Sequence, residues 1–234
     1  MTERYGERYG ERHPELDGAR IFLQPIAAPS IVGLYGFAIA TFMVAANLAR
    51  WYGTDLAAQT FVVPFAIFSG GLAQFLAGMW AFRARDALAT AMHSMWGSFW
   101  IGYGLLILLN AAGVITVPTA FGKFVPLGYW FIPLSIITLT GAVAALRVNL
   151  LLAMVLFFLG MGSAWAVAAF FHGNLWLFRA AGYSFIVSAF FAWWTATGLM
   201  FEAMTGREIP PLIDLRKKPE VVTGAGEPGV IVGQ

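Results

Sequence analysis

The chain has 234 residues, of which 59% are hydrophobic, 16% aromatic and only 11% charged. Soluble domains carry about 25% charged residues, so this composition excludes an ordinary water-soluble domain. The net charge of +2 and the scatter of Lys and Arg along the chain give no support for a nucleic-acid partner. The absence of cysteine excludes disulfides and thiolate metal sites.

Six stretches of the chain are long and apolar enough to cross a lipid bilayer, which needs about 20 mostly apolar residues. They cover residues 29–50, 59–82, 87–110, 125–146, 148–171 and 180–202. The connections between them are short, so neighbouring helices are expected to run antiparallel. We therefore predict an all-α integral membrane protein, in which residues 29–204 form one six-transmembrane-helix bundle without a second domain.

Two polar segments flank the predicted bundle. Residues 1–28 contain the repeated sequence ERYG, and residues 205–234 are rich in Pro, Gly and charged residues. Neither segment can bury a core, so we expect a mobile N-terminal tail and a mobile C-terminal tail, both cytoplasmic.

The distribution of Lys and Arg predicts the orientation, because cytoplasmic segments carry an excess of these residues. If both termini are cytoplasmic, only Arg50, Lys123 and Arg179 lie outside. Eleven then lie inside: Arg4, Arg8, Arg12, Arg20, Arg83, Arg85, Arg147, Arg207, Arg216, Lys217 and Lys218. We predict a multi-pass protein of the plasma (inner) membrane.

The second span, with the sequence IFSGGLAQFLAG at residues 67–78, carries small residues at a spacing of four. In lipid, helices associate through close backbone approach at such small faces. Gln74 lies within this stripe and is expected to face protein. An unpaired amide in hydrocarbon costs several kcal/mol, so Gln74 either bonds a neighbouring helix or lines a hydrated path.

Charged residues are almost absent from the predicted spans. Glu202, in the last turn of the sixth, is the exception, and it is either a capping residue or a site of proton release to the cytoplasm. The sequence shows no paired carboxylates, no metal-spaced His cluster and no nucleophile or phosphate-loop motif. We expect no catalytic residue, no metal and no cofactor.

His93 is the one titratable side chain in midspan range. An imidazole can exchange protons near neutral pH, so His93 could pass a proton to an incoming carboxylate. The alternative is a neutral imidazole bonded to a neighbouring carbonyl or to water.

The block IFSGGLAQFLAGMWAFRARD, followed by GSFW at 97–100 and preceded by GLYGF at 33–37, resembles the signature of the acetate uptake transporter family. Its bacterial members are the YaaH-type succinate-acetate permeases. The resemblance covers about residues 28–211 and implies a homohexamer with one path in each subunit. One departure is that Ala28 opens the first helical motif, where the family usually has Asn.

The same resemblance maps the family's apolar constriction onto Phe37, Trp96 and Leu156, with Trp96 where the family has Tyr. A bare carboxylate entering a low-dielectric medium costs on the order of 20 kcal/mol, whereas a neutral polar group costs about 2–7 kcal/mol. The permeant species at the constriction should therefore be protonated, or fixed dipoles must solvate the anion. Thr41, Gln74 and Ser98 are the candidate polar groups of the path.

These observations predict the uptake of acetate or a similarly small monocarboxylate together with a proton, from one side of the lipid bilayer to the other. A passive channel for small neutral solutes or acids is the first alternative. A membrane sensor or scaffold that does not transport is the second.

Overall fold

The computed structural model describes residues 26–53, 55–117, 122–207, 209–213 and 215. Most of the predicted N-terminal tail and the end of the C-terminal tail lie outside these residues. Within them, six helical segments are long and apolar enough to cross a membrane. The elements are α1 (Pro29–Leu48), α2 (Leu56–Phe65), η3 (Ala66–Ala73), α3 (Gln74–Arg83), α4 (Ala87–Ala111), α5 (Val125–Ala145), α6 (Leu150–His172) and α7 (Leu175–Thr205). The predicted all-α class and the six spans are confirmed.

Polar side chains set where several of these helices begin. Asp55, Asp86, Asn149 and Asn174 each accept a hydrogen bond from a backbone N–H in the first turn of the helix that follows. Such N-caps satisfy donors that have no partner within the helix.

The sixth span was predicted to begin at residue 180, and this boundary is wrong. Gly173, whose φ of 67° suits glycine, is the C-cap of α6, and Asn174 caps α7 directly. The connection between the predicted spans 148–171 and 180–202 is therefore only a short turn. His172 ends α6, and Arg179 lies within α7, where its guanidinium stacks 5.2 Å from the Trp176 ring.

The second span is not the continuous α-helix that its spacing predicted. It runs from α2 through the π-helix η3 into α3. Pro64 lacks the N–H that an α-helix needs at that position, and the wider π turn follows directly. η3 keeps small residues on the protein side, where Gly70 and Gly71 are buried, and it ends at Gln74. Since π-helical turns are rare and often occur at functional sites, Gln74 stands at an unusual point of the backbone.

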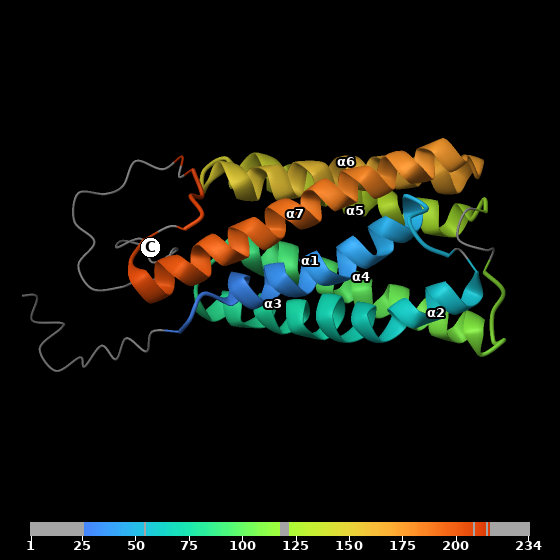
Figure 1. Ribbon diagram of the computed structural model, residues 1–234, viewed down its shortest axis with the longest axis horizontal. Coiled ribbons are helices and arrows are strands. Elements are labelled where there is room, and N and C mark those ends of the chain that lie inside the picture. Colours follow the sequence, from blue (N-terminus) through green and yellow to red (C-terminus); the bar gives the residue numbers. More distant parts are fainter. Residues whose placement is uncertain (1–25, 54, 118–121, 208, 214, 216–234) are drawn as a thin grey trace, which may run out of the picture.

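The helices form an elongated bundle in which α1–α4 lie on one side and α5–α7 on the other (Figure 1). α1 joins the two groups by packing against α7. Close approach depends on glycine: a Cβ at Gly36 would meet the backbone oxygen of Ser69, and one at Gly182 would meet the backbone of α1. Within the described residues, no Cα of α4 lies within 8 Å of a Cα of α6. Side chains and cavities fill that separation.

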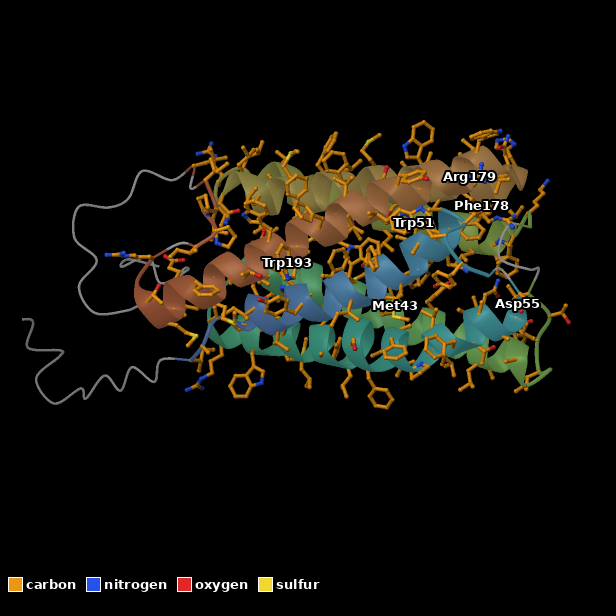
Figure 2. All side chains as sticks on the ribbon, viewed as in Figure 1. Met43, Trp51, Asp55, Phe178, Arg179 and Trp193 are labelled. Carbon is orange, nitrogen blue, oxygen red and sulfur yellow. The ribbon has the colours of Figure 1, made fainter. Side chains whose placement is uncertain are left out.

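Both described chain ends lie at one end of the bundle, which we call the terminal end (Figure 1). The turns at residues 84–86 and 146–149 lie at this end as well. Asp55, Trp51, Phe178 and Arg179 lie toward the opposite end (Figure 2). Seven of the eleven basic residues behind the predicted orientation lie outside the described residues, so cytoplasmic termini remain a prediction.

Part of the predicted C-terminal tail is held against the bundle. Leu212 is 3% exposed, and Trp194 donates a hydrogen bond from Nε1 to the Pro211 oxygen over 3.2 Å. The backbone N–H of Leu150 donates to the Ile213 oxygen at 3.0 Å. The described residues 209–213 thus strap the terminal end of α6 and α7.

Candidate functional site

Phe37, Trp96 and Leu156 are buried and line one cavity inside the bundle. They come from α1, α4 and α6, and each is at most 4% exposed. The rings of Phe37 and Trp96 pack edge to face, with centroids 6.2 Å apart and planes at 76°. The structure therefore brings together three side chains that the sequence could relate only through a family resemblance.

A cavity of about 50 Å³ lies on the terminal side of these residues, and we call it the terminal cavity. All three constriction residues line it, together with Gln74, His93 and residues of the terminal end such as Ser30 and Asp86. A cavity of about 10–15 Å³ by this measure holds one water molecule. The terminal cavity therefore has room for a few waters or a small organic acid.

Two polar groups in the terminal cavity are buried without a complete set of partners. Gln74 Oε1 and His93 Nδ1 have no hydrogen-bond partner among the described residues. His93 Nε2 lies 3.4 Å from Ser30 Oγ, and a Cβ at Gly33 would lie 2.6 Å from the imidazole. The imidazole thus packs closely against the first turn of α1. An unsatisfied buried polar atom costs about 1–3 kcal/mol, so both atoms are suited to bond a solute in the cavity.

A second cavity, of about 40 Å³, lies on the other side of Trp96, and we call it the aromatic cavity. Its wall includes Trp96, Phe99, Trp100, Tyr103, Phe131, Phe170, Phe178 and Phe185. Two buried polar atoms of this wall, Thr41 Oγ1 and Trp100 Nε1, have no hydrogen-bond partner among the described residues. Trp96 and Leu159 line both cavities, so these two side chains form part of the wall between them.

The indole N–H of Trp96 is engaged in a hydrogen bond. Nε1 donates to Thr138 Oγ1 on α5 over 3.0 Å. The Trp96 N–H is therefore not free to solvate a passing anion, because a side chain from a neighbouring helix already accepts its hydrogen bond.

Two predicted site residues do not join this cluster. Ser98 is exposed, and its hydroxyl donates to the Ser94 oxygen of its own helix at 2.8 Å. Glu202 lies near the end of α7, and it lines neither cavity in the described part of the chain. Of the five residues predicted as polar lining or proton relay, Thr41, Gln74 and His93 line a cavity.

Sequence reasoning missed Leu159, Trp100 and Thr138. Leu159 follows Leu156 by three residues and Trp100 follows Trp96 by four, so helical spacing alone places each pair on one face. That signal could have found both. Thr138 could not be found in this way, because its partner Trp96 lies on another helix and 42 positions earlier.

Comparison with known proteins gives matches along most of the chain. The model of the GPR1/FUN34/yaaH family matches residues 10–215. The succinate-acetate/proton symporter SatP of Escherichia coli is 25% identical over 187 residues, which cover 80% of this chain and 95% of the symporter. Acetate permease A of Emericella nidulans is 30% identical over 184 residues, which cover 73% of this chain and 60% of the permease.

A second fungal relative has a different name. Ammonia transport outward protein 2 of Saccharomyces cerevisiae is 27% identical over 174 residues, with coverage of 73% and 60%. The chain thus spans about 60% of the length of both fungal relatives.

The structure of the bacterial acetate channel SatP has the same fold. The TM-score is 0.73 at 23% identity, over 80% of this chain and 99% of the channel. These relatives are transporters or a channel rather than enzymes, as the missing catalytic motifs predicted. With the matched family model and six membrane-spanning helices, the chain is a multi-pass membrane protein that belongs to the GPR1/FUN34/yaaH family.

Proposed function

We propose that this protein carries acetate or a similarly small monocarboxylate inward across the plasma (inner) membrane, coupled to a proton. The observation that carries the proposal is the pair of small cavities, each with unsatisfied polar atoms, on either side of the constriction. The symporter, permease and channel among its relatives support the same substrate class.

The constriction favours the neutral acid over its anion. Phe37, Trp96 and Leu156 offer no charge to a passing solute, and stripping water from a carboxylate costs on the order of 20 kcal/mol in the idealised limit. The corresponding cost for a neutral polar group is about 2–7 kcal/mol. A protonated acid is therefore the species that we expect at the constriction.

The terminal cavity fits the same species. A protonated carboxylic acid offers one O–H donor and one carbonyl acceptor, whereas a carboxylate only accepts. Gln74 Oε1, an unpartnered acceptor, can accept from the neutral acid but repels the anion. For the proton we propose His93, since its imidazole lines the cavity beside Ser30, whereas Glu202 does not.

The experiment is uptake of radiolabelled acetate into proteoliposomes, with protein-free liposomes as the control for passive permeation. Symport predicts protein-dependent uptake under an inward proton gradient that saturates with acetate concentration. Protein-dependent uptake that rises linearly with concentration would favour the passive channel, for which the likeness to a structure described as a channel is the specific support. If the protein produces no flux of any short acid, the sensor or scaffold is the alternative that agrees with the result.

We extend the proposal to a homohexamer with cytoplasmic termini. Large apolar side chains such as Phe68, Leu76 and Trp80 are exposed along the second span, and they can meet lipid or a neighbouring subunit. Native mass spectrometry of detergent-solubilised protein measures the subunit number. Protease access to the termini in sealed vesicles measures the orientation.

A further inference from the structure

Trp96 is held by a hydrogen bond that crosses from α4 to α5. Its Nε1–H donates to Thr138 Oγ1 at 3.0 Å, and the Thr138 hydroxyl donates in turn to the Leu134 oxygen at 2.6 Å. Because the one hydroxyl proton of Thr138 goes to its own helix, the oxygen presents a lone pair to the indole. Thr138 is 0% exposed, so water does not replace this bond.

The bond fixes a side chain that lies in the wall between the two cavities. Trp96 packs edge to face on Phe37 and on Phe99, whose ring centroid is 5.1 Å away. Apolar contacts of this kind tolerate rotation of the ring, whereas a hydrogen bond through a single ring atom does not. Any rotamer that turned the indole away would leave a donor and an acceptor buried without partners.

The acceptor is itself firmly placed. One turn before Thr138, Ser135 donates its hydroxyl hydrogen bond to the Gly160 oxygen of α6 over 2.9 Å. A Cβ at Gly160 would lie 2.6 Å from the Leu139 side chain, so α5 and α6 pack closely there. Trp96 is therefore tied to the helix pair that lies across the path, although α4 and α6 make no direct backbone approach within the described residues.

We infer that Thr138 is a positioning residue, which locks the Trp96 indole in one pose and thereby sets the size of acid that passes. This inference rests on the proposed function, and it assigns the size selectivity to a pair of residues rather than to the aromatic ring alone. The wide indole ring needs a fixed orientation if a narrow path is to remain beside it.

The test compares Thr138→Val, which keeps the shape of the side chain and removes the hydroxyl, with Thr138→Ser, which keeps the hydroxyl. Both full-length variants are reconstituted in proteoliposomes, and initial uptake of acetate, propionate and butyrate is measured. The acetate-to-butyrate ratio should fall about three- to tenfold in Thr138→Val, as expected from loss of one buried hydrogen bond. Thr138→Ser should keep the ratio within about twofold of the wild type.

A double-mutant cycle separates positioning from a general structural role. Trp96→Phe has no N–H to donate, so adding Thr138→Val to it should leave the ratio unchanged. An equal fall of the ratio in both backgrounds would overturn the inference, and so would an unchanged ratio in Thr138→Val alone. If no variant and no wild type carries any acid, the proposed function fails instead.

A second measurement tests the inference even if Thr138→Val does not fold. In protein labelled with ¹⁵N-tryptophan, the Nε1–H signal that disappears in Trp96→Phe belongs to Trp96. It should exchange slowly with D₂O in the wild type and in Thr138→Ser. Fast exchange in the folded wild type would show that the bond does not hold the ring, and would overturn the inference.

Discussion

The terminal cavity and the aromatic cavity share one wall but differ in the polar groups that they offer. The terminal cavity presents an amide oxygen and an imidazole, from Gln74 and His93. The aromatic cavity presents a hydroxyl and an indole N–H, from Thr41 and Trp100, within a ring of aromatic side chains. The imidazole and the amide acceptor thus line the terminal cavity, whereas hydroxyl groups and an indole donor line the aromatic cavity.

This difference suggests a division of tasks. Under the proposed function, the shared wall would select by the cost of removing water, and it would distinguish small neutral acids only by size. The terminal cavity can accept the O–H of an acid, which only the protonated form carries. The aromatic cavity mainly supplies donors for a carbonyl and apolar surface for a short alkyl group.

Widening the predicted constriction should weaken selection by size. Leu156→Ala removes one of the three constriction side chains and should reduce discrimination against longer acids by up to about 200-fold, the range over which apolar pockets distinguish one methylene. Competition of unlabelled acids against acetate uptake measures the change. Leu105→Ala, on the exposed face of α4, is the matched control and should behave as the wild type.

Removing the imidazole should slow the protonation of an incoming carboxylate without blocking the path. His93→Gln should lower the initial rate of acetate uptake under an inward proton gradient by about tenfold or more, because a positioned proton-transfer group contributes about 10²–10⁴-fold. Acetate exchange at equal pH on both sides needs no net proton transfer and should persist. An unchanged dependence of uptake on pH in this variant removes His93 as the proton relay.

Removing the acceptor of the terminal cavity should weaken uptake without changing the size limit. Gln74→Leu should reduce acetate uptake by up to about tenfold, the equivalent of one net hydrogen bond of about 0.5–1.5 kcal/mol. Gln59→Leu is the matched control, since Gln59 also has an unpartnered amide nitrogen but lines neither cavity. Equal losses in the two variants would contradict a specific role for Gln74.

The same change in the aromatic cavity should have a smaller effect. Thr41→Val keeps the volume of the side chain and removes the hydroxyl. We expect a loss of about threefold in acetate uptake, at the low end for one hydrogen bond, because the Trp100 N–H remains in the same cavity. A larger loss than in Gln74→Leu would reverse the comparison between the cavities.

Ser98→Ala should change acetate uptake by less than about twofold, as surface substitutions usually do. The Ser98 hydroxyl bonds within its own helix and faces outward. Measuring uptake and thermal stability together distinguishes a role of Ser98 in transport from a role in the structure of its helix. A clear loss of uptake at normal thermal stability would indicate that Ser98 contacts the substrate. The substrate would then follow a route outside the two cavities.

Much of the architecture follows from the amino-acid sequence. The bilayer demands about 20 apolar residues for each span, and a chain with so few charges shows clearly where each span is interrupted. Its small-residue stripe also indicated that Gln74 faces protein, and Gln74 is buried. Helix ends follow less closely from charge, because an uncharged Gly-Asn pair separates α6 from α7.

The tertiary structure decided what hydropathy cannot encode. The π turn after Pro64, the outward direction of Ser98 and the bond between Trp96 and Thr138 depend on helix rotation and on neighbours that are distant in the chain. Hydropathy records which residues avoid water, and it is nearly the same for side chains that face lipid and those that face a path. Only the packing of six helices separates the two groups, because close backbone approach at glycine fixes how each helix is turned.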